Sequence, residues 1–150
     1  MYSKDEGDFL SDIRRMTSMY EQPVNDKPTL LGVKQLENFK SVLAEEVNEV
    51  DEIIENYKKS ENNLNEEDKI KILTELSDWL GDIVVYCSNE ATKHGIDISK
   101  VLDIIMQSNF SKMGADGKPI KDERGKFLKG PNYWKPEPKI SEFIKDQLDK

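Results

Sequence analysis

The sequence has 150 residues, of which 36% are hydrophobic and 35% are charged, and its mean hydropathy is −0.72. It contains no long apolar run with the flanks of a signal peptide or a membrane span, so we expect one cytoplasmic domain, residues 1–150, with a modest core. The net charge of −8 argues against general binding to nucleic acid or to an anionic membrane.

The charge is distributed unevenly along the chain. Between Glu45 and Asp82 there are thirteen acidic and four basic residues, whereas between Lys112 and Lys135 there are seven basic and three acidic residues. An acidic centre is therefore followed by a basic segment.

The single cysteine and the single histidine argue against a disulfide and against a metal site built from Cys or His. Cys87 lies in an apolar helical run, so there is no intrachain disulfide and no Cys-based zinc site, and we expect a reduced core residue. His94 stands just before Gly95 at a predicted helix end, without a second ligand at metal-binding spacing. We therefore expect His94 to interact favourably with the helix dipole at the C-terminal end of this helix.

Apolar residues spaced three and four apart predict five helices. The first covers residues 8–19, and the clearest pattern in the chain predicts a long helix over 36–57. A second long helix is expected over 66–94, a further one that Asp97 can cap and that closes near Gly114, and a short terminal one over 140–148.

The stretches between these helices predict loops. Residues 58–65 are polar, and residues 113–138 are rich in Gly, Pro and charged residues. Within the latter segment, the residues around Ile120 and Phe127 predict a hairpin that turns across 122–125. The expected fold is all-α, a four-helix type of bundle over about 8–112 followed by this irregular segment.

Acidic residues on the first long helix break its amphipathic pattern. On a helical wheel, Glu46 falls at the edge of the apolar stripe and Glu49 lies about 60° further round. Glu52 and Glu55 point far away from that stripe. A carboxylate at a packed edge must be paired, protonated or bound to a metal, so Glu46 and Glu49 are candidate functional residues.

The second long helix carries a matching acidic line. Glu75, Asp78 and Asp82 are three and four residues apart and border Trp79, which we expect in the core. If the two helices are antiparallel, the acidic lines converge, and they would repel each other unless a divalent cation lay among them. Oxygen ligands favour Mg²⁺, Mn²⁺ or Ca²⁺ over zinc. The alternative is a solvated acidic stripe.

These residues resemble the all-α nucleoside triphosphate pyrophosphohydrolases, which include MazG-type enzymes, dimeric dUTPases and phosphoribosyl-ATP pyrophosphohydrolases. The family pattern is Glu-x-x-Glu on one helix and Glu-x-x-Asp on the next. Here "LAEEVNEVDEI" supplies Glu46 and Glu49, and "ELSDWLGDIVVY" supplies Glu75 and Asp78, with Asp82 as an additional acid. The segments "PVNDKPTL", "SNFSKMGADGKPI" and "GKFLKGPNYWKPEP" resemble a phosphoribosyl-ATP pyrophosphohydrolase-like branch.

The resemblance implies Mg²⁺-dependent hydrolysis of an NTP or dNTP to the nucleoside monophosphate and pyrophosphate, in nucleotide-pool housekeeping, with Mn²⁺ as a substitute. It implies a homodimer or tetramer that completes the bundle, which suits so thin a core. Glu49 and Glu46 would be catalytic, Glu49 by taking a proton from the attacking water. The implied metal ligands are Glu46, Glu49, Glu75, Asp78 and Asp82. Lys40 departs from the pattern, because many relatives have Arg there.

The basic segment supplies candidate contacts to the nucleotide. Lys112, with Asn109 one turn before it, resembles the family's nucleotide contact, and the basic residues that follow are candidates for charge on the phosphates. Tyr133 and Trp134 could stack on a base or cover the end of the bundle. The full set of candidate substrate-binding residues is Asn109, Lys112, Arg124, Lys126, Lys129, Asn132 and Tyr133.

Two alternatives remain open at this point. The first is phosphoribosyl-ATP hydrolysis in histidine biosynthesis. The second is a non-catalytic helical interaction module whose acidic face docks a basic partner or merely binds a cation. The second alternative predicts no pyrophosphate release and gives no reason for the positions of Glu46 and Glu49.

Overall fold

The computed structural model describes residues 8–150, and its contacts divide the chain into two compact units. The first unit comprises the chain up to Asn25 together with Thr29–Gly95, and the second comprises Asp26–Pro28 and Ile96–Lys150. The helix predicted from Asp97 to near Gly114 thus belongs with the C-terminal segment, and it ends earlier than predicted, at Phe110. The assignment of residues 1–150 to one domain stays a prediction.

The secondary structure is helical apart from one two-stranded hairpin, which confirms the all-α fold class. Within residues 8–150, none of the helices is both long enough and apolar enough to cross a membrane.

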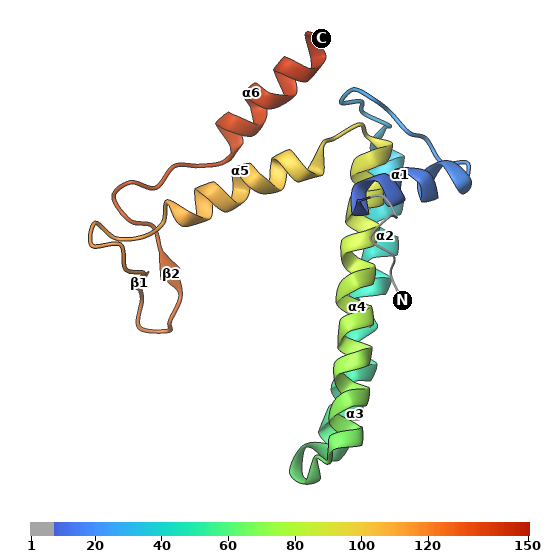
Figure 1. The fold of residues 1–150 in the computed structure, drawn as a ribbon, viewed down its shortest axis with the longest axis vertical. Coiled ribbons are helices and arrows are strands. Elements are labelled where there is room, and N and C mark those ends of the chain that lie inside the picture. The colour runs from blue at the N-terminus through green and yellow to red at the C-terminus, as the bar shows by residue number, and fades with distance from the viewer. Residues whose placement is uncertain (1–7) are drawn as a thin grey trace. The chain divides into compact units, whose positions relative to one another are not determined.

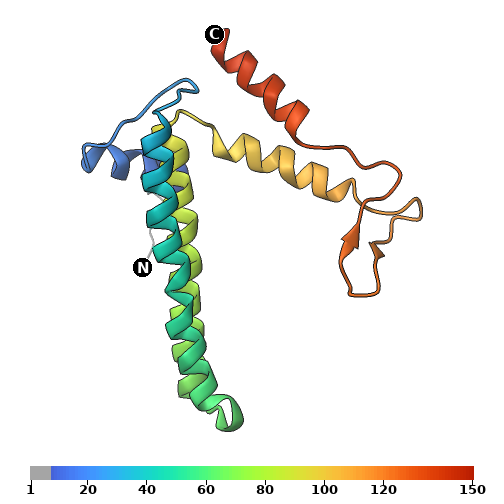
Figure 2. The ribbon, with the colours of Figure 1, turned by 180° about the vertical axis from the view of Figure 1, so that it is seen from behind.

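The first unit is organised around one long helix, α4 (Figures 1 and 2). The helices α1, α2 and α3 all pack on α4. The helices α2 and α3 follow one another along α4 in the opposite direction, so the two acidic helices are antiparallel, as their predicted convergence requires. The elements of this unit are α1 (Phe9–Met19), α2 (Val33–Asn48), α3 (Val50–Ser60), the 3-10 turn η1 (Glu61–Asn63) and α4 (Glu66–Lys93).

Local side-chain caps explain where several helices begin and end. The carboxylate of Asp8 accepts the Ser11 N–H at 2.8 Å, and the Asn65 side chain accepts the Asp68 N–H at 2.8 Å. Asp97 caps the following helix in the same way. Gly95 follows α4 with a φ of 67°, a left-handed conformation that suits glycine. These starts and stops agree with the sequence predictions.

The long helix predicted over 36–57 is corrected in three respects. It begins earlier, at Val33, and ends later, at Ser60, so the predicted loop over 58–65 is largely helical. It is also interrupted at Glu49, where the Glu49 N–H donates to the Glu46 carbonyl oxygen at 3.2 Å. This bond spans three residues instead of four, which tightens the helix at this point.

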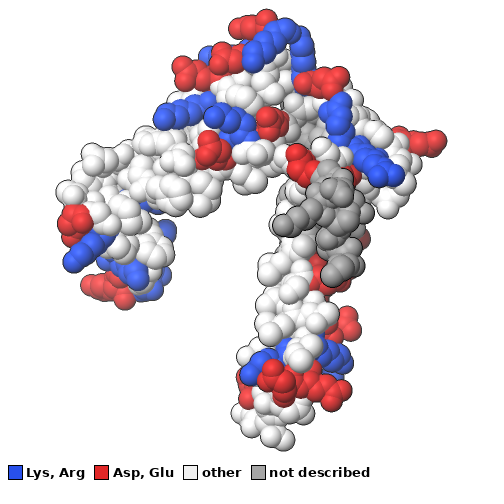
Figure 3. Space-filling view, in the orientation of Figure 1, with Lys and Arg blue, Asp and Glu red and all other residues white. Residues whose placement is uncertain are grey.

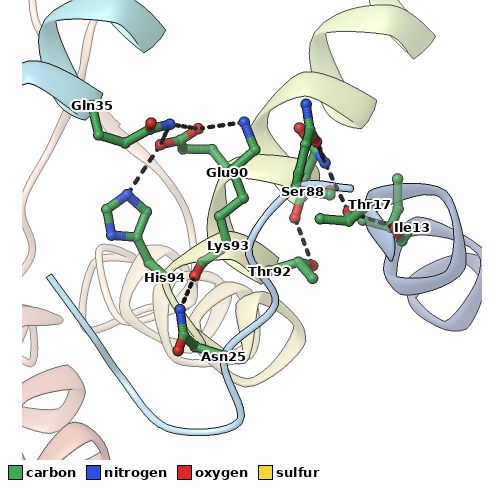
Figure 4. Close-up of polar contacts among 11 residues, drawn as sticks. Ile13, Thr17, Asn25, Gln35, Ser88, Glu90, Thr92, Lys93 and His94 are labelled. Carbon is green, nitrogen blue, oxygen red and sulfur yellow. Dashed lines mark hydrogen bonds and ion pairs between the residues drawn. The ribbon is translucent and has the colours of Figure 1, made fainter. Parts of the chain in front are cut away.

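A polar cluster fixes the C-terminal end of α4 against the segment that leads into α2 (Figure 4). His94 is buried, with Nε2 3.0 Å from Oε1 of Glu90 and Nδ1 3.0 Å from the Thr29 carbonyl oxygen. The Gln35 amide donates to both Glu90 oxygens, at 3.0 and 3.2 Å. Asn25 donates to the carbonyl of Lys93 at 2.7 Å. His94 therefore does more than complement the helix dipole.

The long helices leave much apolar surface uncovered. One expectation for α4 was wrong, because Cys87 is exposed. At Gly81, on the same helix, a Cβ would have no atom within 4 Å apart from the chain neighbours and the backbone of α4 itself. Both residues lie on or beside a face of α4 that nothing in the first unit covers, and Figure 3 shows a stretch of the α3–α4 pair with few charged side chains. This exposed apolar stripe consists of Ile70, Leu73, Leu80, Val84 and Cys87.

The second unit contains α5 (Ile98–Phe110), the strands β1 (Ile120–Lys121) and β2 (Phe127–Leu128), and α6 (Glu137–Leu148). The strands pair antiparallel, with Ile120 opposite Leu128, which confirms the predicted hairpin. The helix α6 begins three residues before the predicted start at 140, because Pro138 is accommodated in its first turn.

Candidate functional site

The helices α3 and α4 of the first unit border a small hollow, with a volume of about 240 Å³. Four of the five predicted metal ligands line it, together with one further acid, and no basic residue does. We call it the acidic hollow. Its lining residues are Glu49, Glu52, Ile53, Glu75, Asp78, Trp79 and Asp82.

Glu46 lies beside this hollow and is the most unusual of the acids. Its side chain is buried, with 7% of the residue exposed, and its Oε1 atom has no hydrogen-bond partner. Burial raises the pKa of Glu46, and the negative charges of Glu49, Asp82 and Asp78 raise it further. Since a buried, unpaired carboxylate oxygen requires either a proton or a cation, Glu46 belongs electrostatically to the acidic hollow.

Glu49 and Glu52 lie differently from the wheel-based expectation. Glu49 is exposed rather than at a packed edge, and Glu52 lines the hollow although the wheel pointed it away. The wheel assumed one straight helix, whereas the chain is interrupted at Glu49. Glu52 also lies only one turn beyond Glu49, so its long side chain reaches the open rim.

Two neighbours that the sequence analysis missed hold the acids in place. Trp79 was expected in the core, but it is half-buried and its indole Nε1 donates to the Glu46 carbonyl oxygen at 2.9 Å. Asn56 on α3 donates to Oε2 of Glu75 at 3.3 Å. The sequence contained a signal for each residue. Trp79 lies beside an acidic line, and a buried indole N–H requires an acceptor. Asn56 is an amide between the apolar positions Ile53 and Tyr57.

The chemistry of this donor set fits a hard divalent cation. The polar groups are carboxylate oxygens, which Mg²⁺ and Mn²⁺ prefer, and the unpartnered Oε1 of Glu46 adds a further donor. Across residues 8–150, however, no three acidic, Cys or His side chains converge closely enough to form a ready-made cation cage. The acids border a common space, and a bound ion would require rotations of their side chains.

The second unit gathers several of the predicted substrate-binding residues at one end of α5. The Gly130 N–H donates to the Lys112 carbonyl oxygen at 2.8 Å, and the Trp134 N–H donates to Oγ of Ser111 at 3.2 Å. A Cβ at Gly130 would overlap the carbonyl group of Met113, so only glycine fits there. Residues 129–133, which include Lys129, Asn132 and Tyr133, are thereby joined to the end of α5. We call Lys112 together with 129–133 the basic platform.

The aromatic rings of this region are each paired with a lysine. The Lys129 ammonium lies 4.9 Å from the centre of the Tyr133 ring, and that of Lys139 lies 3.9 Å from the Trp134 ring. A base that stacked on the same face of Tyr133 would have to displace Lys129.

The other three candidates are exposed. Asn109 lies in the last turn of α5, and Arg124 and Lys126 lie at the turn of the β1–β2 hairpin. The backbone N–H groups of Arg124 and Lys126 both donate to Oδ1 of Asp122 at 2.9 Å, so their side chains extend from a fixed turn.

Comparison with known proteins gives two matches. The family model described as the MazG nucleotide pyrophosphohydrolase domain matches residues 34–112, a range that contains all five predicted metal ligands together with Asn109 and Lys112. Among solved structures, a "putative NTP pyrophosphohydrolase" from Exiguobacterium sp. 255-15 has a similar fold. The likeness covers 97% of this chain and 98% of that chain, with a TM-score of 0.53 and 19% sequence identity. No curated protein is significantly similar in sequence.

Proposed function

Because the chain belongs to the MazG nucleotide pyrophosphohydrolase domain family, we propose that it hydrolyses a nucleoside triphosphate, NTP or dNTP, to the monophosphate and pyrophosphate in a Mg²⁺-dependent reaction. Family membership makes the chain a hydrolase of nucleotide pyrophosphate bonds. The proposal adds the metal, the triphosphate substrate and the residues. A cytoplasmic location and a role in nucleotide-pool housekeeping stay predictions.

The observation that carries this proposal is the acidic hollow with the buried Glu46 beside it. Five carboxylates line the hollow without a basic residue among them. Without a cation, these carboxylates would repel one another and would also repel a triphosphate. A divalent cation bound there would neutralise charge on the phosphates and lower the pKa of the attacking water. The residues that would hold it are Glu46, Glu49, Glu75, Asp78 and Asp82.

Glu49 is our candidate for the group that accepts a proton from the attacking water. It is exposed at the interruption between α2 and α3 and lines the hollow, so substrate and water can reach it. Glu46 is buried beside it and contributes charge and position.

The basic platform is proposed to contact the nucleotide. Lys112 and Lys129 supply positive charge near one end of α5, and Tyr133 supplies an aromatic ring. Asn109 and Asn132 supply side-chain amides that can hydrogen-bond to a base or sugar, and the cations on the hairpin turn, Arg124 and Lys126, are further candidates for the phosphates.

A second copy of the chain is proposed to cover the exposed apolar stripe of α4, as a homodimer or within a tetramer. Leu73 and Val84 are each 54% exposed, which is unusual for residues at helical core spacing. Beside the stripe, an apolar groove of about 610 Å³ lies between α3 and α4 and is lined by residues that include Ile54, Tyr57 and Leu73. Apolar surface of this kind is usually covered by a partner.

Phosphoribosyl-ATP is the second candidate substrate. The observation in its favour is that the Lys-Gly-Pro-Asn-Tyr segment, on which that resemblance rests, is fixed to α5 through Gly130. A non-catalytic interaction module is disfavoured by the family match.

The test is a pyrophosphate-release assay across NTPs, dNTPs and phosphoribosyl-ATP, with and without Mg²⁺. Wild type is compared with Glu49→Gln and with a matched control, Glu55→Gln, which removes an exposed acid of α3 that does not line the hollow. We expect Mg²⁺-dependent turnover that Glu49→Gln lowers by about 10²-fold or more and that Glu55→Gln leaves unchanged. Turnover that is independent of metal, or equal in the two variants, would contradict the mechanism.

A further inference from the structure

The Glu46 carbonyl oxygen accepts two hydrogen bonds that do not belong to a regular α-helix. One comes from the Glu49 N–H at 3.2 Å, and the other comes from the indole Nε1 of Trp79 at 2.9 Å. Trp79 lies on α4, 33 residues away in the sequence. The helix that carries Glu46 is therefore interrupted at the place where a side chain of the neighbouring helix bonds to its backbone.

This interruption separates two of the predicted metal ligands. The helix α2 ends at Asn48 and α3 begins at Val50, so Glu49 is the one residue between them. Glu46 lies in the last turn of α2. The direction of the Glu49 side chain relative to Glu46 therefore depends on how the backbone turns at this point, and the Trp79 indole is bonded to that turn.

Trp79 also belongs to the acidic line of α4. It directly follows Asp78 and precedes Asp82 by three residues, and all three line the acidic hollow. The indole has one donor and two side-chain torsions, so a hydrogen bond from it fixes position with little freedom. The bond thus joins the backbone that carries Glu46 and Glu49 to the helix that carries the opposing acids.

We propose that Trp79 is a positioning residue for divalent-cation binding, because its indole N–H holds the α2–α3 junction in register with Asp78 and Asp82. This inference rests on the proposed Mg²⁺ dependence and deepens it by assigning the residue that aligns the ligands. Trp79 itself contacts neither ion nor substrate in this account. Loss of a hydrogen bond that orients a metal ligand without touching the ion typically changes metal affinity or activity by 10- to 100-fold.

The competing interpretation is that Trp79 only fills space between α2 and α4. The substitution Trp79→Phe distinguishes the two interpretations, because it keeps an aromatic ring and removes the N–H donor. If Trp79 only fills space, the variant should have a lower melting temperature and an unchanged affinity for a cation. If Trp79 positions the ligands, the variant should bind a cation more weakly even under conditions where it is fully folded.

The experiment uses Mn²⁺ alone as the probe, without nucleotide. Mn²⁺ binding is measured by titration calorimetry on wild type, on Trp79→Phe and on the control Trp134→Phe, which alters the other of the two tryptophans in the chain. In the Trp134→Phe protein, Trp79 is the only tryptophan, so its fluorescence also reports the titration. We expect Mn²⁺ to bind Trp79→Phe about tenfold more weakly than wild type and to bind Trp134→Phe with the affinity of wild type. In Trp134→Phe, Mn²⁺ should quench the fluorescence of Trp79 with the same midpoint as the calorimetric titration.

If Trp79→Phe does not fold, replacement of Trp79 by benzothienylalanine removes only the N–H, because sulfur takes its place in a ring of nearly equal shape. An unchanged Mn²⁺ affinity in a folded variant, with Mg²⁺-dependent turnover in the wild type, would overturn this inference and leave the proposed function standing. A wild type that neither binds Mn²⁺ nor requires Mg²⁺ would overturn both.

Discussion

The side-chain amide of Asn56 on α3 donates a hydrogen bond of 3.3 Å to Oε2 of Glu75 on α4. The contact joins α3 to α4 and orients Glu75, a predicted metal ligand that lines the acidic hollow. Since Asn56 bears no charge, its effect on Glu75 is one of direction and partial charge compensation.

We predict that Asn56→Ala lowers Mg²⁺-dependent activity by about tenfold through misorientation of Glu75, while the protein stays folded. The measurement is the Mg²⁺ concentration that gives half-maximal turnover, which should rise. Asn63→Ala, a change to an exposed amide of η1, is the matched control and should behave as wild type. Equal Mg²⁺ requirements in the two variants would exclude a role for Asn56.

Glu46 gives a prediction about pH. Its pKa in the folded protein is raised above the usual value of 4.5, chiefly by burial and then by the charge of Glu49. Between the unfolded and the folded pKa, the folded state therefore binds more protons than the unfolded state. In metal-free protein the free energy of unfolding should consequently fall as the pH rises through this window.

The substitution Glu46→Gln should remove that part of the pH dependence and raise the melting temperature of the metal-free protein at neutral pH, because the buried unpaired charge is gone. Thermal melts of both proteins in EDTA, from pH 4 to pH 8, provide the measurement. If the wild type loses no more stability over this range than Glu46→Gln, the burial of an ionised Glu46 is not costly.

Mg²⁺ should reverse the effect of pH on wild type. A cation that binds only the folded state stabilises it by about 2.7 kcal/mol at a concentration 100 times its Kd. The rise in melting temperature on addition of Mg²⁺ should be larger at pH 8 than at pH 5, because protons compete for Glu46. If Glu46 is an essential ligand, Mg²⁺ at the same concentration should not raise the melting temperature of Glu46→Gln. An equal rise in both proteins would show that Glu46 is not a metal ligand.

Gly130 gives a prediction about the basic platform. A Cβ at this position would overlap the carbonyl group of Met113 and lie 2.8 Å from the Lys112 carbonyl oxygen. Gly130→Ala should therefore displace residues 129–133, destabilise the protein by about 1–3 kcal/mol and raise KM for the nucleotide more than it lowers kcat. Ser141→Ala, a change to an exposed residue of α6 outside the platform, is the control. An unchanged KM in folded Gly130→Ala would argue against nucleotide contact by this segment.

The sequence allowed helix ends and the hairpin to be predicted because their causes are local. The caps at Asp8, Asn65 and Asp97 bond to residues three positions away, and the hairpin depends on the turn formed by Asp122 and Gly125. The burial of Glu46 was likewise predictable from its phase on a helix whose apolar stripe is clear.

The features that were missed have causes distant in the sequence. The interruption at Glu49 coincides with a hydrogen bond from Trp79 to the Glu46 carbonyl oxygen. The buried His94 contacts the Thr29 carbonyl oxygen, 65 residues away in the sequence, and Glu90, which Gln35 also contacts. Cys87 was assigned to the core because its spacing matched an apolar face, but spacing does not reveal whether that face is covered within the same chain.

The most direct test of the central claim is to identify the products that wild type forms from a Mg²⁺-bound nucleoside triphosphate. We predict equal amounts of pyrophosphate and nucleoside monophosphate in the presence of Mg²⁺, none when EDTA removes the metal, and a loss of about 10²-fold or more in Glu49→Gln. Release of orthophosphate in place of pyrophosphate, or undiminished turnover in EDTA, would contradict the account.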